Sequence, residues 1–216
     1  MTPSAALGGG YGQRLPDPGP TVAAVLEAAR PGDPEAHLAV IAGPPGVGKS
    51  AAAQRLVEVL AGALWLDKDV LASGFVLQAA RDLGREQAYA GEHYDRCLRP
   101  LEYAASMAMA CANLVGPRLV LLVGGWGPEL GVPELWTGLG ARLAPSRLTV
   151  VQLDPPPLEE WRRRMGERGS RTDSPWFEEL VRAVTSLPVW PGAVRLSSAP
   201  PLPQVVQSLL DLLTPG

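Results

Sequence analysis

The hydrophobic pattern of the chain alternates between short apolar runs and longer stretches with helical periodicity. A continuous apolar run such as HLAVIA is typical of a strand that is buried on both faces. Such runs predict strands at residues 37–42, 63–66, 118–123, 148–153 and 193–196. Helices are predicted at 21–30, 50–61, over much of 69–115, within 128–142, from 158, at 174–186 and at 204–213. Short strands alternating with helices predict a mostly parallel sheet covered by helices on both faces.

Composition and charge narrow the class of protein. Apolar residues make up 46% of the 216 residues and charged residues 19%, which indicates a folded chain. The net charge of -3 argues against a dedicated nucleic-acid partner. No apolar run reaches the roughly 18 residues of a membrane helix, so no membrane partner is expected.

The cysteines and the N-terminal segment indicate the cellular compartment in which the protein is expected. The two cysteines, Cys97 and Cys111, predict no disulfide framework and suit a reducing environment. The N-terminus has no basic region followed by an apolar core, so no secretory signal is expected. Together these features predict a cytoplasmic protein, and the sequence leaves homo-oligomer formation open.

The most informative motif follows the first predicted strand. The segment GPPGVGKS fits the pattern G-x-x-x-x-G-K-[ST] of a phosphate-binding P-loop. It consists of Gly43, Pro44, Pro45, Gly46, Val47, Gly48, Lys49 and Ser50. Glycines let successive backbone N–H groups point at phosphate oxygens, while the lysine reaches the β- and γ-phosphates and the serine hydroxyl ligates Mg²⁺. A strand before the motif and a helix after it favour this interpretation over a simple glycine-rich turn. The motif therefore predicts binding of ATP and Mg²⁺.

Two aspartates follow the second predicted strand, in the segment LDKD. Asp67 and Asp69 are expected at the carboxyl edge of the sheet, where doubly wound proteins bind their ligands. A carboxylate there can accept the proton of an attacking hydroxyl or hold metal-bound water. We expect Asp69 to be the base and Asp67 to support Mg²⁺ water or the turn. The structural alternative is that Asp69 caps a helix beginning near Val70.

An arginine-rich helix follows the fourth predicted strand. Arg164 and Arg168 are four residues apart and share a helix face, and Arg171 follows in the next loop. Arginines over the phosphates would neutralise the charge that develops during phosphoryl transfer. The alternative is a solvated face on which these arginines pair with neighbouring glutamates. That alternative accounts well for Arg162 and Arg163.

The segment 94–103, YDRCLRPLEY, lies between the second and third predicted strands. Its aromatic and charged residues suit a substrate-binding surface. The alternative is an ordinary helix that starts at Pro100 and has Glu102 in its first turn. The sequence does not separate the two interpretations.

These motifs together resemble the small P-loop kinases of the chloramphenicol phosphotransferase and zeta-toxin type. The resemblance rests on GPPGVGKS, LDKD, the segment 94–103 and the Arg164-x-x-x-Arg168 pair, and it spans residues 38–213. It implies a P-loop NTPase fold, a three-layer α/β sandwich with a central five-stranded sheet. Residues 1–37 would form an arm and a short helix, and 38–216 the kinase domain. An acceptor-binding insertion is implied at about 70–115 and a lid at about 158–173.

The resemblance also implies a chemistry. Such kinases use ATP and Mg²⁺ to phosphorylate a hydroxyl of a small molecule, here an antibiotic or another secondary metabolite. Asp69 matches the position of their general base. The lid arginines Arg164, Arg168 and Arg171 match positions that contact phosphates or adenine.

One departure from these kinases affects the third strand. The family often carries an aspartate at the end of that strand, whereas this chain continues with Gly124, Gly125 and Trp126. We expect Trp126 and Trp136 to lie on loops near the sheet edge, either as an apolar wall for the substrate or in the core. Two alternatives to the small-molecule kinase therefore stay open. One is a zeta-like kinase of a nucleotide sugar, and the other is an ATP-binding regulatory protein without kinase chemistry.

Overall fold

A five-stranded sheet forms the centre of the computed structural model, which describes residues 15–85, 88–89, 91–169, 172 and 175–214. The strands are β1 (His37–Ala42), β2 (Leu64–Asp67), β3 (Leu119–Val123), β4 (Arg147–Asp154) and β5 (Val194–Ser197). Their order is β2-β3-β1-β4-β5, and every neighbouring pair is parallel. The predicted strands are confirmed to within one residue at each end. Because all strands run the same way, the segments that follow β1, β2 and β4 meet at one edge of the sheet.

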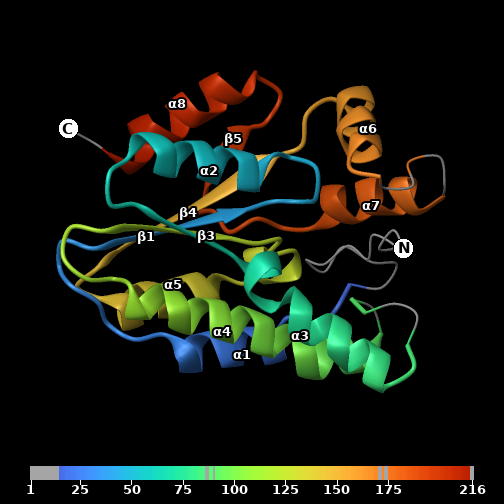
Figure 1. Ribbon diagram of the computed structural model, residues 1–216, viewed down its shortest axis with the longest axis horizontal. Coiled ribbons are helices and arrows are strands. Elements are labelled where there is room, and N and C mark those ends of the chain that lie inside the picture. The colour runs from blue at the N-terminus through green and yellow to red at the C-terminus, as the bar shows by residue number, and fades with distance from the viewer. Residues whose placement is uncertain (1–14, 86–87, 90, 170–171, 173–174, 215–216) are drawn as a thin grey trace.

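Helices cover both faces of this sheet (Figure 1). One layer contains α1 (Gly19–Ala28), α4 (Arg99–Ala112) and α5 (Pro133–Leu143), and the opposite layer contains α2 (Lys49–Val59) and α8 (Leu202–Leu213). Successive residues of a strand point to opposite faces, so Val40 and Leu122 pack on the first layer and Ile41 and Val123 on the second. The predicted three-layer α/β sandwich is confirmed.

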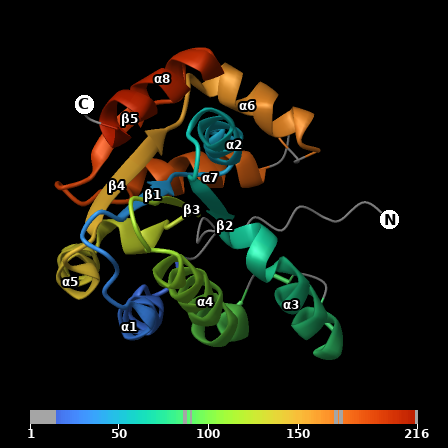
Figure 2. The same ribbon diagram turned by 60° about the vertical axis from the view of Figure 1, so that its left-hand side comes forward.

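Further helices gather where the strands end. Helix α3 (Lys68–Asp82) follows β2, a π-helical turn η1 (Tyr94–Leu98) leads into α4, and the 3-10 turn η2 (Pro128–Gly131) precedes α5. Helices α6 (Leu158–Glu167) and α7 (Pro175–Ser186) follow β4. Figure 2 shows α6 beside α2, while α3 extends away from the sheet. Within the described ranges, no helix has the length and apolarity that a membrane span requires.

The start of α1 differs from the sequence-based prediction. The helix begins at Gly19 with Pro18 at the N-cap, two residues before the predicted start, and Thr21 is a fully buried residue of its first turn. Proline at the helix start supplies a backbone angle that suits the first turn, which explains the earlier beginning. Helix α1 packs against α4 and α5 and so belongs to the same layer. Residues 1–14 of the predicted arm lie outside the described residues.

Candidate active site

The P-loop, residues 43–50, connects β1 to α2 at the carboxyl edge of the sheet. Gly43, Gly46 and Gly48 have φ angles of +144°, +82° and +89°, a region that glycine enters without strain. The ammonium group of Lys49 donates a hydrogen bond to the carbonyl of Pro44 at 2.8 Å, which closes the curl of the loop. Helix α2 begins at Lys49, so the positive end of its dipole faces the loop. A curled backbone in front of a helix N-terminus suits an anion such as a phosphate.

Helix α6 packs on the outer side of this loop. The indole Nε1 of Trp161 donates a hydrogen bond to the carbonyl of Pro45 at 2.8 Å. A Cβ atom at Gly46 would lie 2.5 Å from the sulfur of Met165 and 3.1 Å from the indole nitrogen. Trp161 and Met165 form a separate apolar cluster with Phe177 of α7. Sequence reasoning missed this contact, because the hydrogen bond joins residues that are 116 positions apart.

Asp67 links the P-loop to the start of α3. The hydroxyl of Ser50 donates to Asp67 Oδ2 at 2.6 Å, and the backbone N–H of Asp69 donates to Asp67 Oδ1 at 3.0 Å. Asp67 is therefore the N-cap of α3, which begins at Lys68. The structural alternative that Asp69 caps the helix is wrong, because the helix starts two residues before Val70. Asp67 is nearly buried, and both of its carboxylate oxygens accept a hydrogen bond.

Asp69 presents a more open carboxylate. Its side chain is 66% exposed, and its Oδ1 lies 2.7 Å from the ammonium nitrogen of Lys68. Desolvation raises the pKa of Asp69, but the charge and hydrogen bond of Lys68, together with Lys49 and Arg168, outweigh this and hold the pKa below its usual value. Asp69 is therefore ionised at neutral pH.

Three other predicted site residues, Asp67, Asp69 and Arg168, lie close enough to Lys49 to act on its charge. The pKa of Lys49 is lowered to about 8, chiefly by burial; the charge of Arg168 acts in the same direction, whereas Asp69 and Asp67 oppose the shift. The structure thus brings together Lys49, Asp67, Asp69 and Arg168. A group that combines a phosphate-binding lysine with an exposed carboxylate can bind a nucleotide and accept a proton beside it.

The remaining lid arginines are placed differently. Arg164 is half-buried, and its guanidinium donates to Glu160 at 2.7 Å and to the carbonyl of Ser198 at 3.0 Å. Arg163 pairs with Glu160 and Glu167, as the solvated-face alternative predicts. In this structure Arg164 therefore joins α6 to the segment after β5, whereas Arg168 lies near the P-loop lysine. Arg171 lies outside the described residues.

A network of buried charges lies behind Asp69. Lys68 is only 1% exposed, and its ammonium nitrogen lies 3.4 Å from Glu102 Oε1. The Tyr94 hydroxyl donates a hydrogen bond to Glu102 Oε2 at 2.7 Å. Burial lowers the pKa of Lys68, but the oxygens of Tyr103, Asp69 and Glu102 outweigh burial and raise the pKa well above its usual value. Lys68 is thus a buried cation. Glu102 lies in the first turn of α4, as the helix alternative predicts, yet its side chain is buried rather than solvated.

No role was predicted for Lys68 from the sequence, although the rarity of lysine in this chain was a signal. The chain has only two lysines, and both belong to the motifs at the sheet edge. A second buried pair, Arg99 and Glu129, joins α4 to η2 through two hydrogen bonds.

The two tryptophans after β3 are not an open apolar wall. Trp126 and Trp136 are each 1% exposed, and Trp136 belongs to α5 rather than to a loop. The rings pack edge-to-face with each other, and Trp126 packs in the same way on Tyr103. Burial of such large apolar rings stabilises the fold, and buried rings cannot line an open substrate surface. Trp126 also has a φ of 54°, in the left-handed region that non-glycine residues rarely adopt.

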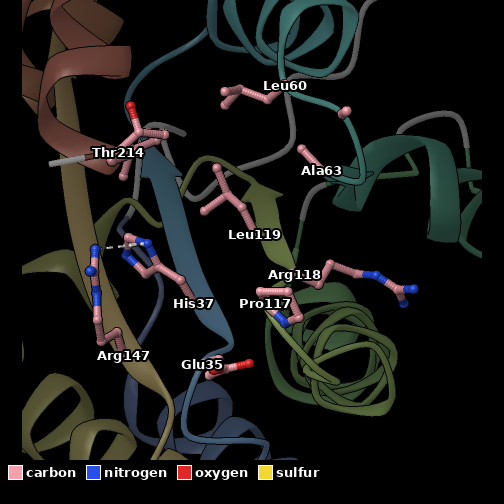
Figure 3. A pocket seen from close by; sticks show the side chains of 11 residues that line it. Glu35, His37, Leu60, Ala63, Pro117, Arg118, Leu119, Arg147 and Thr214 are labelled. Atoms are coloured by element: carbon pink, nitrogen blue, oxygen red, sulfur yellow. Dashed lines mark hydrogen bonds between the residues drawn. The ribbon is translucent and has the colours of Figure 1, made fainter. Parts of the chain in front are cut away.

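A hollow at the opposite edge of the sheet is separate from the P-loop (Figure 3). Its lining includes Glu35, His37, Arg118 and Arg147, at or near the first residues of β1, β3 and β4, and Thr214 at the end of α8. Both ring nitrogens of His37 have a partner there: Arg147 lies 3.2 Å from Nδ1, and the Thr149 hydroxyl lies 2.8 Å from Nε2. This hollow is therefore remote from the residues that could handle a phosphate.

The residues of the P-loop edge fit a nucleotide with Mg²⁺. The hydroxyl of exposed Ser50 and the carboxylate of Asp67 are oxygen donors of the kind that Mg²⁺ prefers, and they lie in direct contact. Within the described ranges, no group of three or more His, Cys, Asp or Glu side chains could hold a metal by itself. Mg²⁺ in nucleotide sites typically binds through one or two protein oxygens together with the substrate phosphates, so Ser50 and Asp67 suffice as its protein ligands.

Comparison with solved structures finds a similar fold in two small-molecule kinases and in a tunicamycin resistance protein. A gluconokinase from Sinorhizobium meliloti 1021 aligns with a TM-score of 0.52 and 20% identity, over 86% of this chain and 93% of that chain. A shikimate kinase from Bacteroides thetaiotaomicron aligns with a TM-score of 0.51 and 16% identity, over 82% and 98% of the two chains. The tunicamycin resistance protein of Deinococcus radiodurans aligns with a TM-score of 0.51 and 20% identity, over 82% and 95%. No protein-family model and no curated protein matches the chain. The chain thus has an α/β P-loop NTPase fold like that of these solved structures.

Proposed function

We propose that the protein is an ATP-dependent phosphotransferase that transfers the γ-phosphate of ATP to a hydroxyl group of a small molecule. The observation that carries this proposal is the position of Asp69. Its exposed carboxylate lies at the carboxyl edge of the sheet, within the electrostatic influence of Lys49 in the P-loop. A protein that only binds ATP has no need of an open carboxylate at this place, whereas phosphoryl transfer to a hydroxyl requires a proton acceptor beside the γ-phosphate.

In the proposed reaction the acceptor oxygen attacks the γ-phosphorus, and its proton passes to the carboxylate of Asp69. The bond between the γ-phosphorus and the bridging oxygen breaks, and ADP leaves with that oxygen. Lys49 and the backbone N–H groups of residues 43–50 hold the phosphates, and Arg168 adds positive charge from the end of α6. When bound, Mg²⁺ neutralises charge on the β- and γ-phosphates, and Ser50 and Asp67 are the residues that would hold it.

The acceptor we propose is an antibiotic or another secondary metabolite with a free hydroxyl. Support comes from the aromatic and charged side chains of the segment between β2 and β3, which include the half-buried Tyr89 beside the buried Tyr94. The tunicamycin resistance protein among the fold neighbours is a further reason to include antibiotics in a search for the acceptor.

One observation favours a second candidate, a nucleotide-binding regulatory protein without kinase chemistry. The residues that follow β3 are Gly124, Gly125 and Trp126, so no acidic side chain at the end of this strand can help to hold a metal. The two candidates differ in one measurable property, because only the kinase forms a phosphorylated product.

The test is a screen of hydroxyl-containing metabolites and antibiotics with ATP and Mg²⁺, read by mass spectrometry for the gain of one phosphoryl group. We expect a phosphorylated product with the wild-type protein. In the Lys49→Ala variant we expect a normal fold and transfer lowered by at least about 10²-fold, as for the loss of one preorganised electrostatic contact. Full turnover by this variant at saturating ATP would show that the site is misassigned. Binding of ATP without any product across the library would favour the regulatory protein.

A further inference from the structure

The pair formed by Lys68 and Asp69 has an unusual geometry for neighbouring residues of a helix. Side chains at positions i and i+1 point in directions about 100° apart, so they do not normally face each other. Here the ammonium nitrogen of Lys68 nevertheless lies 2.7 Å from Asp69 Oδ1. The ammonium group is buried, with 2% of the side chain exposed, whereas 66% of the Asp69 side chain is exposed. The lysine therefore contacts the carboxylate from inside the protein.

The lysine is itself held by the segment that follows α3. Glu102 Oε1 lies 3.4 Å from the ammonium nitrogen, and the hydroxyl of Tyr94 fixes the other oxygen of that glutamate at 2.7 Å. The ammonium group also lies over the rings of Tyr103, 5.2 Å from its centroid, and Tyr89, 5.9 Å from its centroid. Carboxylates and aromatic faces are the environments that stabilise a buried cation. The position of Lys68 is thus determined by residues of η1 and α4.

Asp69 has few other constraints of this kind. Its backbone N–H is fixed by Asp67, but the carboxylate itself is mostly exposed to solvent. An exposed aspartate side chain samples more than one rotamer unless a partner holds it. Placement of a catalytic group matters greatly, since a displacement of about 1 Å can cost roughly 10²-fold in rate.

We propose that Lys68 is a positioning residue, which holds the Asp69 carboxylate where an acceptor hydroxyl meets the γ-phosphate. This inference rests on the proposed function. It adds that the segment from Tyr94 to Glu102 acts on the reaction through a buried lysine, without touching the nucleotide. Lys68 contacts neither the reacting atoms nor the phosphates in this scheme, and its whole effect passes through Asp69.

The test uses calorimetric binding of Mg·ADP, with and without aluminium fluoride, so no acceptor needs to be known. Aluminium fluoride stands in for the transferring phosphoryl group, and a water molecule takes the place of the acceptor. We expect Lys68→Met to keep the affinity for Mg·ADP within about twofold, because the P-loop is unchanged. The extra affinity that aluminium fluoride provides should fall by about 10²-fold.

A double variant separates positioning from a general structural effect. If Lys68 acts through Asp69, Asp69→Asn loses the same extra affinity, and Lys68→Met causes no further loss in the Asp69→Asn background. Arg55→Met is the matched control, because Arg55 is an exposed arginine of α2 whose partner Glu58 is also exposed. It should behave as wild type.

Removal of Lys68 alone leaves the carboxylate of Glu102 buried without a cation, which can prevent folding. The variant Lys68→Met/Glu102→Gln removes both charges, and the glutamine oxygen still accepts from Tyr94. It should fold and show the same loss of extra affinity as Lys68→Met.

The failure of this proposal and of the proposed function would look different. The role of Lys68 would be overturned if both Lys68→Met variants kept the full gain in affinity from aluminium fluoride. It would also be overturned if Lys68→Met reduced this gain further in the Asp69→Asn background. In either case the proposed kinase activity would stand. A wild-type protein that does not bind Mg·ADP, or gains nothing from aluminium fluoride, would overturn the proposed function and with it the role of Lys68.

Discussion

Asp67 and Asp69 show how strongly the start of a helix separates two nearby side chains. Helix α3 begins between them, so Asp67 lies under the P-loop while the Asp69 carboxylate is open to solvent. Asp67 uses both oxygens for the Ser50 hydroxyl and the helix N-cap. The two carboxylates are therefore suited to different tasks, the first to the metal side and the second to the acceptor side.

Asp69→Asn tests the acceptor side. Asparagine keeps the size of the side chain but cannot accept the hydroxyl proton. We expect kcat to fall by about 10² to 10⁴, the usual span for loss of a general base, with little change in ATP affinity or thermal stability. The measurement is steady-state transfer to the acceptor found in the screen, beside calorimetric binding of ATP.

Asp67→Asn tests the metal side. Asparagine is as good an N-cap as aspartate, so the melting temperature should stay close to that of wild type. The negative charge beside Ser50 is lost, and we expect a higher Mg²⁺ concentration for half-maximal activity together with a milder fall in kcat. A titration of activity against Mg²⁺ measures this. An inactive Asp67→Asn beside a nearly normal Asp69→Asn would exchange the two roles.

Single residues were predicted well where a motif fixes their neighbours in the sequence. The spacing of the P-loop motif identifies Lys49 and Ser50 as site residues directly. The two aspartates were identified because they follow a buried strand. Lys68 was missed because its burial depends on Glu102, which lies 34 residues further along the chain. Arg164 shares a helix face with Arg168, yet contacts from Glu160 and the segment after β5 give it another partner.

At the scale of elements, the P-loop and α6 form one packed unit. The loop curls around glycines, and the helix covers the outside of that curl with Trp161 and Met165. Side chains of α6 therefore occupy the space that a Cβ atom at Gly46 would need. Any side chain at this position would separate the loop from α6.

A pair of glycine variants distinguishes this packing from backbone strain. Gly46 and Gly62 have almost the same φ, +82° and +81°, but a Cβ atom at Gly62 would meet nothing within 4 Å. Both alanine variants should lose about 1–2 kcal/mol of stability from the left-handed backbone. Gly46→Ala alone should also weaken binding of Mg·ATP by at least about 10-fold, because the phosphate loop must shift away from Met165. Equal ATP affinities in the two variants would contradict the proposed role of this contact.

The strands and most helices were predictable because each leaves a local pattern. A continuous apolar run marked β1, and proline or glycine marked the ends of several helices. The sequence did not reveal the π-helical turn Tyr94–Leu98, since its form depends on the burial of Tyr94 and on the start of α4. The tryptophans after β3 were ambiguous for a related reason, as their position relative to the core depends on tertiary packing.

At the scale of the whole molecule, the sheet separates two polar edges with different chemistry. The edge after the strands carries the P-loop and its charges. The edge before the strands carries His37, whose Nε2 lies 2.8 Å from the Thr149 hydroxyl oxygen. Burial, with a contribution from the positive charge of Arg147, lowers the pKa of His37 to about 4. The order of the strands across the sheet, by contrast, was not predicted, because alternating strands and helices are compatible with several orders.

The shifted histidine predicts how stability depends on pH. Above about pH 6.5 the ring is neutral in both the folded and the unfolded chain. Between about pH 6.5 and 4 the unfolded chain binds a proton that the folded chain does not, so stability falls as the pH falls. The loss from this one group is about 3 kcal/mol at most.

Urea unfolding at pH 7 and pH 4 should show this effect. In the His37→Gln variant, stability should fall less steeply over the same interval, because glutamine does not titrate. Other groups titrate equally in both proteins, so the difference between the two slopes reports His37. Parallel slopes for wild type and variant would show that His37 is protonated as readily in the folded chain as in the unfolded one.

The contact between Trp161 and the P-loop has an optical consequence. Tryptophan emission depends on the immediate surroundings of the indole, and Trp161 donates its N–H to a carbonyl of the phosphate-binding loop. Trp126 and Trp136 lie on the other side of the sheet from α2, in the same apolar cluster as α1 and α5. Nucleotide binding should therefore change the fluorescence of Trp161 more than that of the core residues Trp126 and Trp136. We expect Mg·ATP to alter the emission of the wild-type protein, and expect most of this change to disappear in Trp161→Phe, while Trp136→Phe retains it.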